Sequence, residues 1–188
     1  MPETPSVSAA AVAAHDGPVL FIADAPNGLE RKLLETWMAP GGAVNPRGDP
    51  LQRVFLDLSE RGKAIDLSEL EGRLNLPGNA LLVPVRMAWA MPQVAQDSRQ
   101  PLSLRHLVLG DPRRPGPLRG RWLLRRDPQR ARCMVGAPAT LDALRSRFGS
   151  QQLSAEDVSP AAFAAFVARQ AALALEIAEW GEIGRRYK

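Results

Sequence analysis

Pro18-Val-Leu-Phe-Ile-Ala23 is a continuous apolar run that closes at Asp24, and it indicates the class of fold. A short uninterrupted run of this kind, bounded by turn-forming residues, is typical of a buried strand. Residues 29–38 follow with apolar side chains at helical spacing, opposite charged ones. Asn27 stands where the N-cap of that helix is expected. The stretch therefore predicts a strand followed directly by an amphipathic helix.

The alternation of strand and helix continues along the chain. Residues 53–56 predict a second strand, and residues 66–74 predict a short amphipathic helix that Asp66 caps. Residues 80–90 then form the most hydrophobic strand candidate of the sequence. The order β-α-β-α-β favours parallel strands covered by helices. Pro84 cannot donate to a sheet ladder, so it predicts an edge position or a bulge in the third strand.

The second half of the chain predicts one strand pair and two helices. Residues 121–126 and 131–136 flank Asp127-Pro128, which indicates strand–turn–strand. Residues 140–149 predict a helix that begins at a threonine N-cap and ends at glycine. Ser159-Pro160 opens the longest helix.

Two faces are expected on that longest helix. Its inward face is predicted to hold Phe163, Phe166, Val167, Gln170, Ala174 and Ile177. Its outward face is predicted to hold Arg169, Glu176 and Glu179. The whole pattern predicts an α/β fold: a layered, mostly parallel sheet with flanking helices and a long C-terminal Ala-rich helix. We expect a disordered tail over residues 1–17, an α/β domain over 18–150 and the C-terminal helix within 151–188.

Cysteine and histidine are too few for a metal or disulfide framework. The 188 residues include one cysteine, Cys133, and two histidines, so neither an intramolecular disulfide nor a Cys/His zinc cluster can form. Cys133 is expected to be a small buried apolar residue. We predict no cofactor and no metal site.

No targeting or membrane-spanning segment is predicted. Residues 1–17 lack the charged start and the apolar length of a signal peptide. Residues 160–178 are the most apolar long segment, but Arg169, Gln170 and Glu176 interrupt them. Any membrane contact is therefore expected to be peripheral.

One third of the sequence is strongly basic, although the net charge is only +4. Between residues 99 and 147 there are twelve arginines and three acids; the arginines are 99, 105, 113, 114, 119, 121, 125, 126, 130, 132, 145 and 147. Such a segment is a solvated face that pairs with another domain's acids, or a site for phosphate or anionic lipid. Nucleic acid is less favoured because no interleaved aromatic residues are present for base stacking.

His106 and Asp111 form the one pair with catalytic spacing, because His-x4-Asp can act as a base and its orienting carboxylate. Asp111 lies in Gly-Asp-Pro, a context in which its carboxylate caps a turn. No glycine-rich phosphate loop or nucleophile elbow accompanies the pair. We assign no catalytic residue.

Several strings in order resemble the region ahead of the catalytic domain in long bacterial glycerol-3-phosphate acyltransferases (the PlsB type). They are residues 82–89 (LVPVRMAW), 104–105 with 110–115 (LR, GDPRRP), 136–141 (GAPATL), 168–170 (ARQ) and 184–188 (GRRYK). The resemblance implies that residues 18–150 are an accessory domain for transfer of an acyl chain from acyl carrier protein or acyl-CoA to glycerol 3-phosphate. It also implies peripheral attachment at the cytoplasmic face of the inner membrane.

The family's catalytic block, approximately His-Arg-Ser-His-x-Asp-Tyr, is absent, as is its Glu-Gly-Gly-Arg-Ser motif. The chain is therefore expected to end before a catalytic domain, to pair with that downstream domain and to be inactive alone. The alternative is a stand-alone basic module that binds anionic lipid or phosphate.

Overall fold

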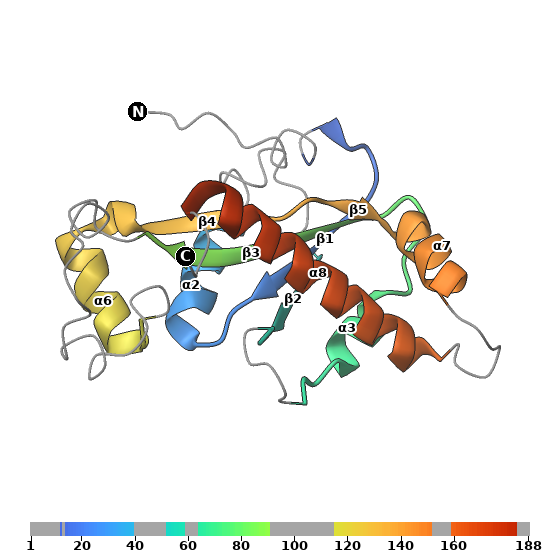
Figure 1. Ribbon diagram of the computed structural model, residues 1–188, viewed down its shortest axis with the longest axis horizontal. Helices are drawn as coiled ribbons and strands as arrows, with labels where there is room; N and C mark the ends of the chain where they lie inside the picture. The colour runs from blue at the N-terminus through green and yellow to red at the C-terminus, as the bar shows by residue number, and fades with distance from the viewer. Residues whose placement is uncertain are drawn as a thin grey trace.

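The computed structural model describes residues 12, 14–39, 52–58, 64–90, 115–151 and 159–183 (Figure 1). The strands are β1 (Val19–Asp24), β2 (Gln52–Leu56), β3 (Leu81–Trp89), β4 (Ala131–Val135) and β5 (Ala139–Thr140). The helices are α2 (Gly28–Met38), α3 (Ser68–Arg73), α6 (Pro117–Arg126), α7 (Leu141–Gln151) and α8 (Pro160–Ile183), with one 3-10 turn (Pro128–Arg130).

The strands form one open, mixed sheet in the order β2-β1-β3-β4, and β5 also pairs with β3. β1 is parallel to β2 and to β3, whereas β4 and β5 run antiparallel to β3. The predicted α/β class and parallel first half are confirmed, and the antiparallel edge was not foreseen. Because the chain moves from β1 outward to β2 and then back past β1 to β3, the two connecting helices lie on opposite faces.

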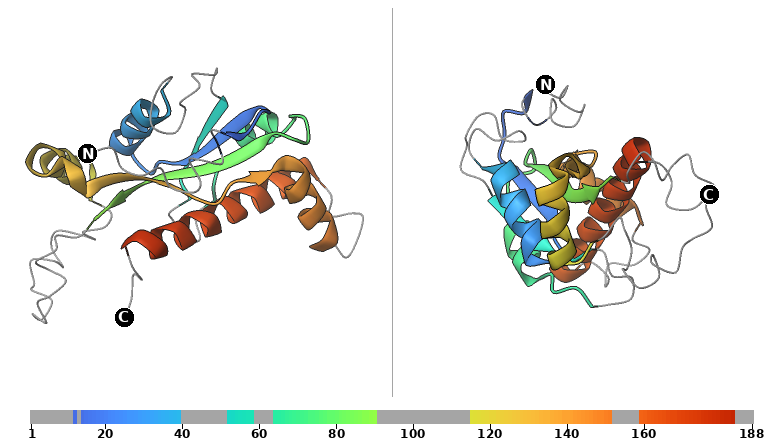
Figure 2. Two further views of the ribbon diagram at one scale, coloured as in Figure 1. Left: turned by 90° about the horizontal axis from the view of Figure 1, so that it is seen from above. Right: turned by 90° about the vertical axis from the view of Figure 1, so that its left-hand side faces the viewer.

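The sheet is the middle of three layers (Figure 2). Successive residues of β1 point to opposite faces: Leu20 and Ile22 join the apolar cluster beneath α3, α7 and α8, whereas Phe21 and Ala23 join the cluster beneath α2. Every residue of β3 is buried, as a central strand covered on both faces should be. The continuous apolar runs in the sequence reflect this two-sided burial.

Helix starts follow the predicted caps in three cases. Asn27 Oδ1 accepts the N–H groups of Leu29 and Glu30 at 3.1 Å each. Thr140 Oγ1 accepts from the Ala143 N–H at 3.3 Å, and Ser159 Oγ accepts from the N–H of Ala162 at 3.1 Å. Each cap satisfies donors that a helix start leaves free.

The prediction for Asp66 is only partly right. Its carboxylate accepts the N–H and the hydroxyl of Ser68, and these hydrogen bonds lower the pKa of Asp66. The cap position of α3 is nevertheless Leu67, which makes no side-chain cap bond.

Pro84 lies in the central strand and pairs regularly with Ile22 of β1, so the predicted edge position is wrong and β3 itself carries no bulge there. The irregularity lies instead in the chain that runs beside β3. Val85 pairs with Val135, and Leu82 pairs with Ala139. Two β3 residues therefore face three residues of the neighbouring chain, 136–138. The Gly136 N–H donates to the Pro84 carbonyl at 2.8 Å. Pro84 has no N–H to donate to Gly136 in return, and Gly136 is the residue directly after the end of β4.

Residues 121–126 are helical, so the predicted strand there is wrong. Pro117 occupies the first turn of α6, and Gly120 and Leu123 form its buried side. The spacing of three residues between them is helical, but the apolar Trp-Leu-Leu run masks it. Likewise α7 does not end at Gly149 but continues to Gln151.

The predicted inward face of α8 is partly right: Phe166 and Val167 are buried and Phe163 packs against the core, but Ile177 was wrongly placed inward and Glu179 wrongly placed outward. Its buried residues are Ala164, Phe166, Val167, Ala168, Ala171, Leu175 and Glu179, whereas Ile177 is 65% exposed. The many alanines make the helix apolar nearly all round, so periodicity alone fixes its orientation poorly.

Among the described residues, α8 is also the one helix that is long and apolar enough to cross a membrane by length and composition. Of its apolar 18-residue stretch, 33% is buried inside the protein. That is weak evidence for a span, because core helices pass the same test.

Several predicted features lie outside the described residues. They are most of the tail over residues 1–17, the string 104–105, residues 110–114 of the string 110–115, and the final string 184–188.

Gly136 is expected to be intolerant of alanine. A Cβ at Gly136 would lie 3.0 Å from the backbone carbonyl carbon of Ala174 and 3.1 Å from its Cβ, so α8 would have to shift. We expect Gly136→Ala to lower the free energy of unfolding by about 1–3 kcal/mol in urea denaturation. Gly149→Ala is the control: it meets open space within α7 and should stabilise by roughly 0.5 kcal/mol. Equal effects of the two would contradict this packing.

Candidate functional site

A buried charge network joins β1, β3 and α8. Asp24 and Arg86 are register partners on β1 and β3, and both face α8 because they share the side of the sheet that carries Leu20 and Ile22. Arg86 Nε and Nη2 each lie 2.6 Å from Asp24 Oδ2, and Nη1 lies 3.1 Å from Glu179 Oε2. The Leu58 N–H donates to Asp24 Oδ1 at 2.8 Å, so the segment after β2 is attached as well.

The network is almost closed to solvent. Asp24, Arg86 and Glu179 are 1%, 5% and 4% exposed. Moving such ions out of water costs several kcal/mol each, which their mutual attraction and hydrogen bonds must offset. Side chains so enclosed cannot exchange protons with a substrate in solution. The network therefore fits a role in stabilising the fold and not a role as an acid–base site.

Sequence reasoning missed this network, although signals for it exist. Arg86 is the one charged residue within 80–90, the most apolar strand of the chain. Asp24 closes the first strand, and the sequence pattern indicates only that the strand ends there at a turn. Glu179 was placed on the outward face of its helix. A lone arginine inside a buried strand requires a buried carboxylate, which is the inference that was available.

A second buried polar contact joins β3 to α2, on the face of the sheet opposite α8. Trp89 Nε1 donates to Glu30 Oε1 of α2 at 3.2 Å, and both residues are buried. A Cβ at Gly120 of α6 would lie 2.7 Å from Leu29 Cδ2 and 3.3 Å from the Trp89 ring. The absence of a side chain at Gly120 thus lets α6 pack closely against α2 and the end of β3.

The outer side of α6 combines apolar and cationic side chains. Leu118 is 80% exposed and Trp122 is 54% exposed, one helical turn apart. The helix also carries four arginines and no acid; they are Arg119, Arg121, Arg125 and Arg126. The Arg126 guanidinium lies 5.3 Å from the centroid of the Trp122 ring. We call this surface the α6 face.

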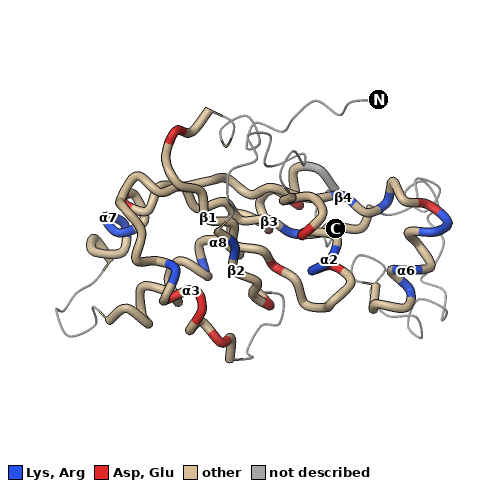
Figure 3. The backbone as a smooth tube through the Cα atoms, turned by 180° about the vertical axis from the view of Figure 1, so that it is seen from behind, with Lys and Arg blue, Asp and Glu red and all other residues tan. Residues whose placement is uncertain are grey.

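The described arginines of the basic third of the sequence do not form one patch. α6 lies at one end of the molecule and α7, with Arg145 and Arg147, lies at the other (Figures 1 and 3). Arg130 Nε is used locally, since it donates to the Ala90 carbonyl at 2.9 Å. Arginines 99, 105, 113 and 114 lie outside the described residues, as do His106 and Asp111, so their predicted roles stay predictions.

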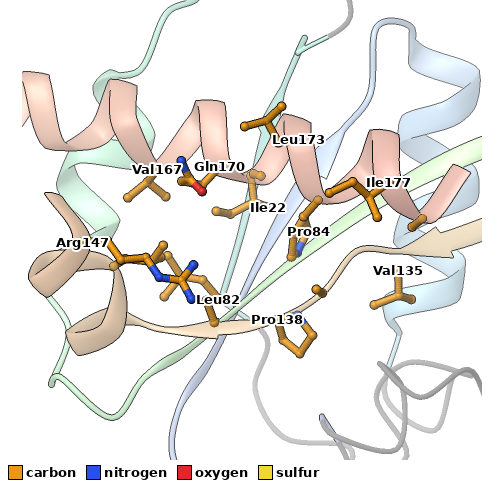
Figure 4. Close-up of a pocket in the computed structure, with 16 residues that line it drawn as sticks. Ile22, Leu82, Pro84, Val135, Pro138, Arg147, Val167, Gln170, Leu173 and Ile177 are labelled. Atoms are coloured by element: carbon orange, nitrogen blue, oxygen red, sulfur yellow. The ribbon is translucent and has the colours of Figure 1, made fainter. Parts of the chain in front are cut away.

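An apolar pocket of about 520 Å³ lies on the α8 side of the sheet (Figure 4). Its floor comes from β1 and β3, one wall from α8, and the facing wall from the bulged chain between β4 and β5. Arg147 of α7 and Gln170 of α8 are its polar lining residues.

Cys133 is partly buried on β4 and packs against the α2-side cluster, broadly as its apolar context predicts. Desolvation raises the pKa of its thiol to about 12, so little reactive thiolate exists at neutral pH. Among the described residues no group of three His, Cys, Asp or Glu side chains could hold a metal ion.

These features define a three-layer α/β domain with a mixed sheet, an apolar pocket and a cationic, tryptophan-bearing helix. No protein-family model matches the chain, and no solved structure matches it.

Removing the central cation should be strongly destabilising. Arg86→Met removes the buried guanidinium that Asp24 and Glu179 share, and we expect the free energy of unfolding to fall by about 3–5 kcal/mol. Urea denaturation followed by circular dichroism measures this.

Arg31→Met is the matched control, because the Arg31–Glu35 pair is exposed and 3.9 Å apart. The Arg31 guanidinium also lies 4.3 Å from the centroid of the Phe55 ring. Losing both contacts should cost about 1 kcal/mol or less, well below the effect of Arg86→Met. The triple variant Asp24→Leu/Arg86→Met/Glu179→Leu should recover much of the loss, and no recovery would contradict a charge-based origin.

Proposed function

We propose that this chain is a non-catalytic accessory domain of a glycerol-3-phosphate acyltransferase, and that it attaches peripherally to anionic membrane lipid through the α6 face. The observation that carries the membrane part is the exposed Leu118–Trp122 pair among four arginines. The acyltransferase part is supported by the ordered strings that resemble this family. The predicted place of attachment is the cytoplasmic face of the inner membrane.

The α6 face suits a lipid surface on physical grounds. Tryptophan favours the boundary between head groups and acyl chains, where its ring is apolar and its N–H stays hydrated. Each arginine near an anionic surface contributes about 1 kcal/mol of attraction at moderate salt. A short helix with two apolar anchors binds reversibly, so the expected association is weak and salt-sensitive.

The same surface also supports the alternative, a stand-alone module for anionic lipid or phosphate. The two proposals differ in whether an acyltransferase domain follows in the same polypeptide. The coding sequence after codon 188 distinguishes them: a His-Arg-Ser-His-x-Asp-like block supports the accessory role, and a stop codon supports the stand-alone module. Nucleic acid is the weaker candidate, because α6 offers one exposed aromatic ring and not a series of stacking platforms.

The chain should float with anionic vesicles and not with neutral ones. We expect flotation with phosphatidylglycerol-containing vesicles at low salt and its loss at high salt. Trp122→Ala or Arg121→Glu/Arg125→Glu should reduce the bound fraction about fivefold or more.

Trp180→Ala and Arg73→Glu/Arg169→Glu are the controls. They change an exposed tryptophan on α8 and exposed arginines on α3 and α8, and they should leave binding nearly unchanged. Equal loss in the α6 and control variants would show that net charge, and not the α6 face, governs binding.

The chain by itself should transfer no acyl group. With glycerol 3-phosphate and acyl-CoA we expect release of coenzyme A at the rate of the enzyme-free blank. Turnover that His106→Ala abolishes would overturn this and would make the His106–Asp111 pair catalytic.

A further inference from the structure

We propose that the pocket between α7, α8 and the sheet binds a single acyl chain that carries an anionic head group, with the head at Arg147. The inference goes beyond the proposed function, since it concerns the opposite layer from α2 and does not depend on membrane attachment.

The pocket exists because three local features keep its walls apart. The extra residue opposite Pro84 displaces the chain at 136–138 from the regular path of an antiparallel strand. Alanines at 171, 174 and 178 leave the facing side of α8 without bulky groups. α7 then closes one end with Leu144 and Arg147. The resulting volume, about 520 Å³, lies in the range of small-molecule sites.

The lining is apolar along its length. Ile22, Leu82 and Pro84 form the floor, and Leu173 and Ile177 stand along α8 at the margin (Figure 4). Leu173 and Ile177 are 51% and 65% exposed although both are large and apolar. A flexible hydrocarbon chain on this floor would cover them from water, which is the driving force for binding.

The polar groups gather at one end. Arg147 and Gln170 extend into the space between α7 and α8 (Figure 4). Among the described residues the Arg147 guanidinium has no carboxylate partner, whereas that of Arg145, two residues earlier, lies 3.8 Å from Asp142. A guanidinium pairs well with a carboxylate or a phosphate, and the Gln170 amide can add a further donor. One cation beside an apolar trough complements one anionic head on one chain.

The experiment is isothermal titration of the whole chain with dodecanoate, dodecyl phosphate and dodecanol. The two anions are kept below their micelle concentrations and dodecanol below its solubility limit. We expect all three to bind, with the two anions tighter than the alcohol. Affinity should rise by up to about fourfold per added methylene between decanoate and tetradecanoate. Whichever anion binds more tightly distinguishes a fatty acid from a phosphorylated lipid as the source of the head group.

Two variants locate the site. Arg147→Gln should weaken the anions about threefold to tenfold and leave dodecanol unchanged, whereas Arg145→Gln should change neither. Ala178→Phe places a ring in the pocket and should abolish binding of all three ligands. Ala161→Phe, on an exposed position of the same helix outside the pocket, should not. Unchanged unfolding midpoints in urea confirm that the variants are folded.

The proposal is overturned if no ligand binds, if Ala178→Phe binds as well as the parent chain, or if Trp122→Ala removes binding while Arg147→Gln does not. The last outcome would place the amphiphile on the α6 face. Vesicle flotation and amphiphile titration use different elements, so either can fail while the other stands.

Discussion

The fold depends on one guanidinium buried between two carboxylates. Arg86 reaches Asp24 within the sheet and Glu179 on the covering helix, and Asp24 also holds the backbone of Leu58. These contacts tie β1, β3, α8 and the chain after β2 at one place. Apolar packing alone would let an alanine-rich helix such as α8 rotate on the sheet at little cost. An ion that must meet its partner allows only one rotation, because every other rotation leaves a charge buried alone.

That fixed rotation determines which surfaces the molecule presents. With Glu179 turned inward, Ile177 and Leu173 are turned outward along the margin of the pocket. The close contact between Gly136 and Ala174 holds the helix near the bulged strand. On the other face, the Trp89–Glu30 hydrogen bond and the gap at Gly120 set α6 against α2. The two candidate binding surfaces, the pocket and the α6 face, are thus consequences of how each layer is attached to β3.

The two surfaces differ in the kind of ligand that they fit. The α6 face combines exposed apolar anchors with four cations, which suits an extended anionic surface. The pocket is concave and holds one arginine, which suits one molecule with one anionic head. Both proposed ligands are lipid-like, but one is an extended surface and the other a single molecule.

The sequence by itself determined the strands at 18–23, 53–56 and 80–90 and the helices that Asn27, Thr140 and Ser159 cap. These features follow from neighbouring residues, through burial patterns and capping side chains. Only the tertiary structure decided the helical state of 121–126, the inward face of α8 and the Asp24–Arg86–Glu179 network. It also separated Arg147 from the arginines of α6, which the sequence had placed in one basic segment. Each of these depends on residues tens of positions apart, and a window of local sequence does not contain the partner that gives a buried charge or an exposed arginine its role.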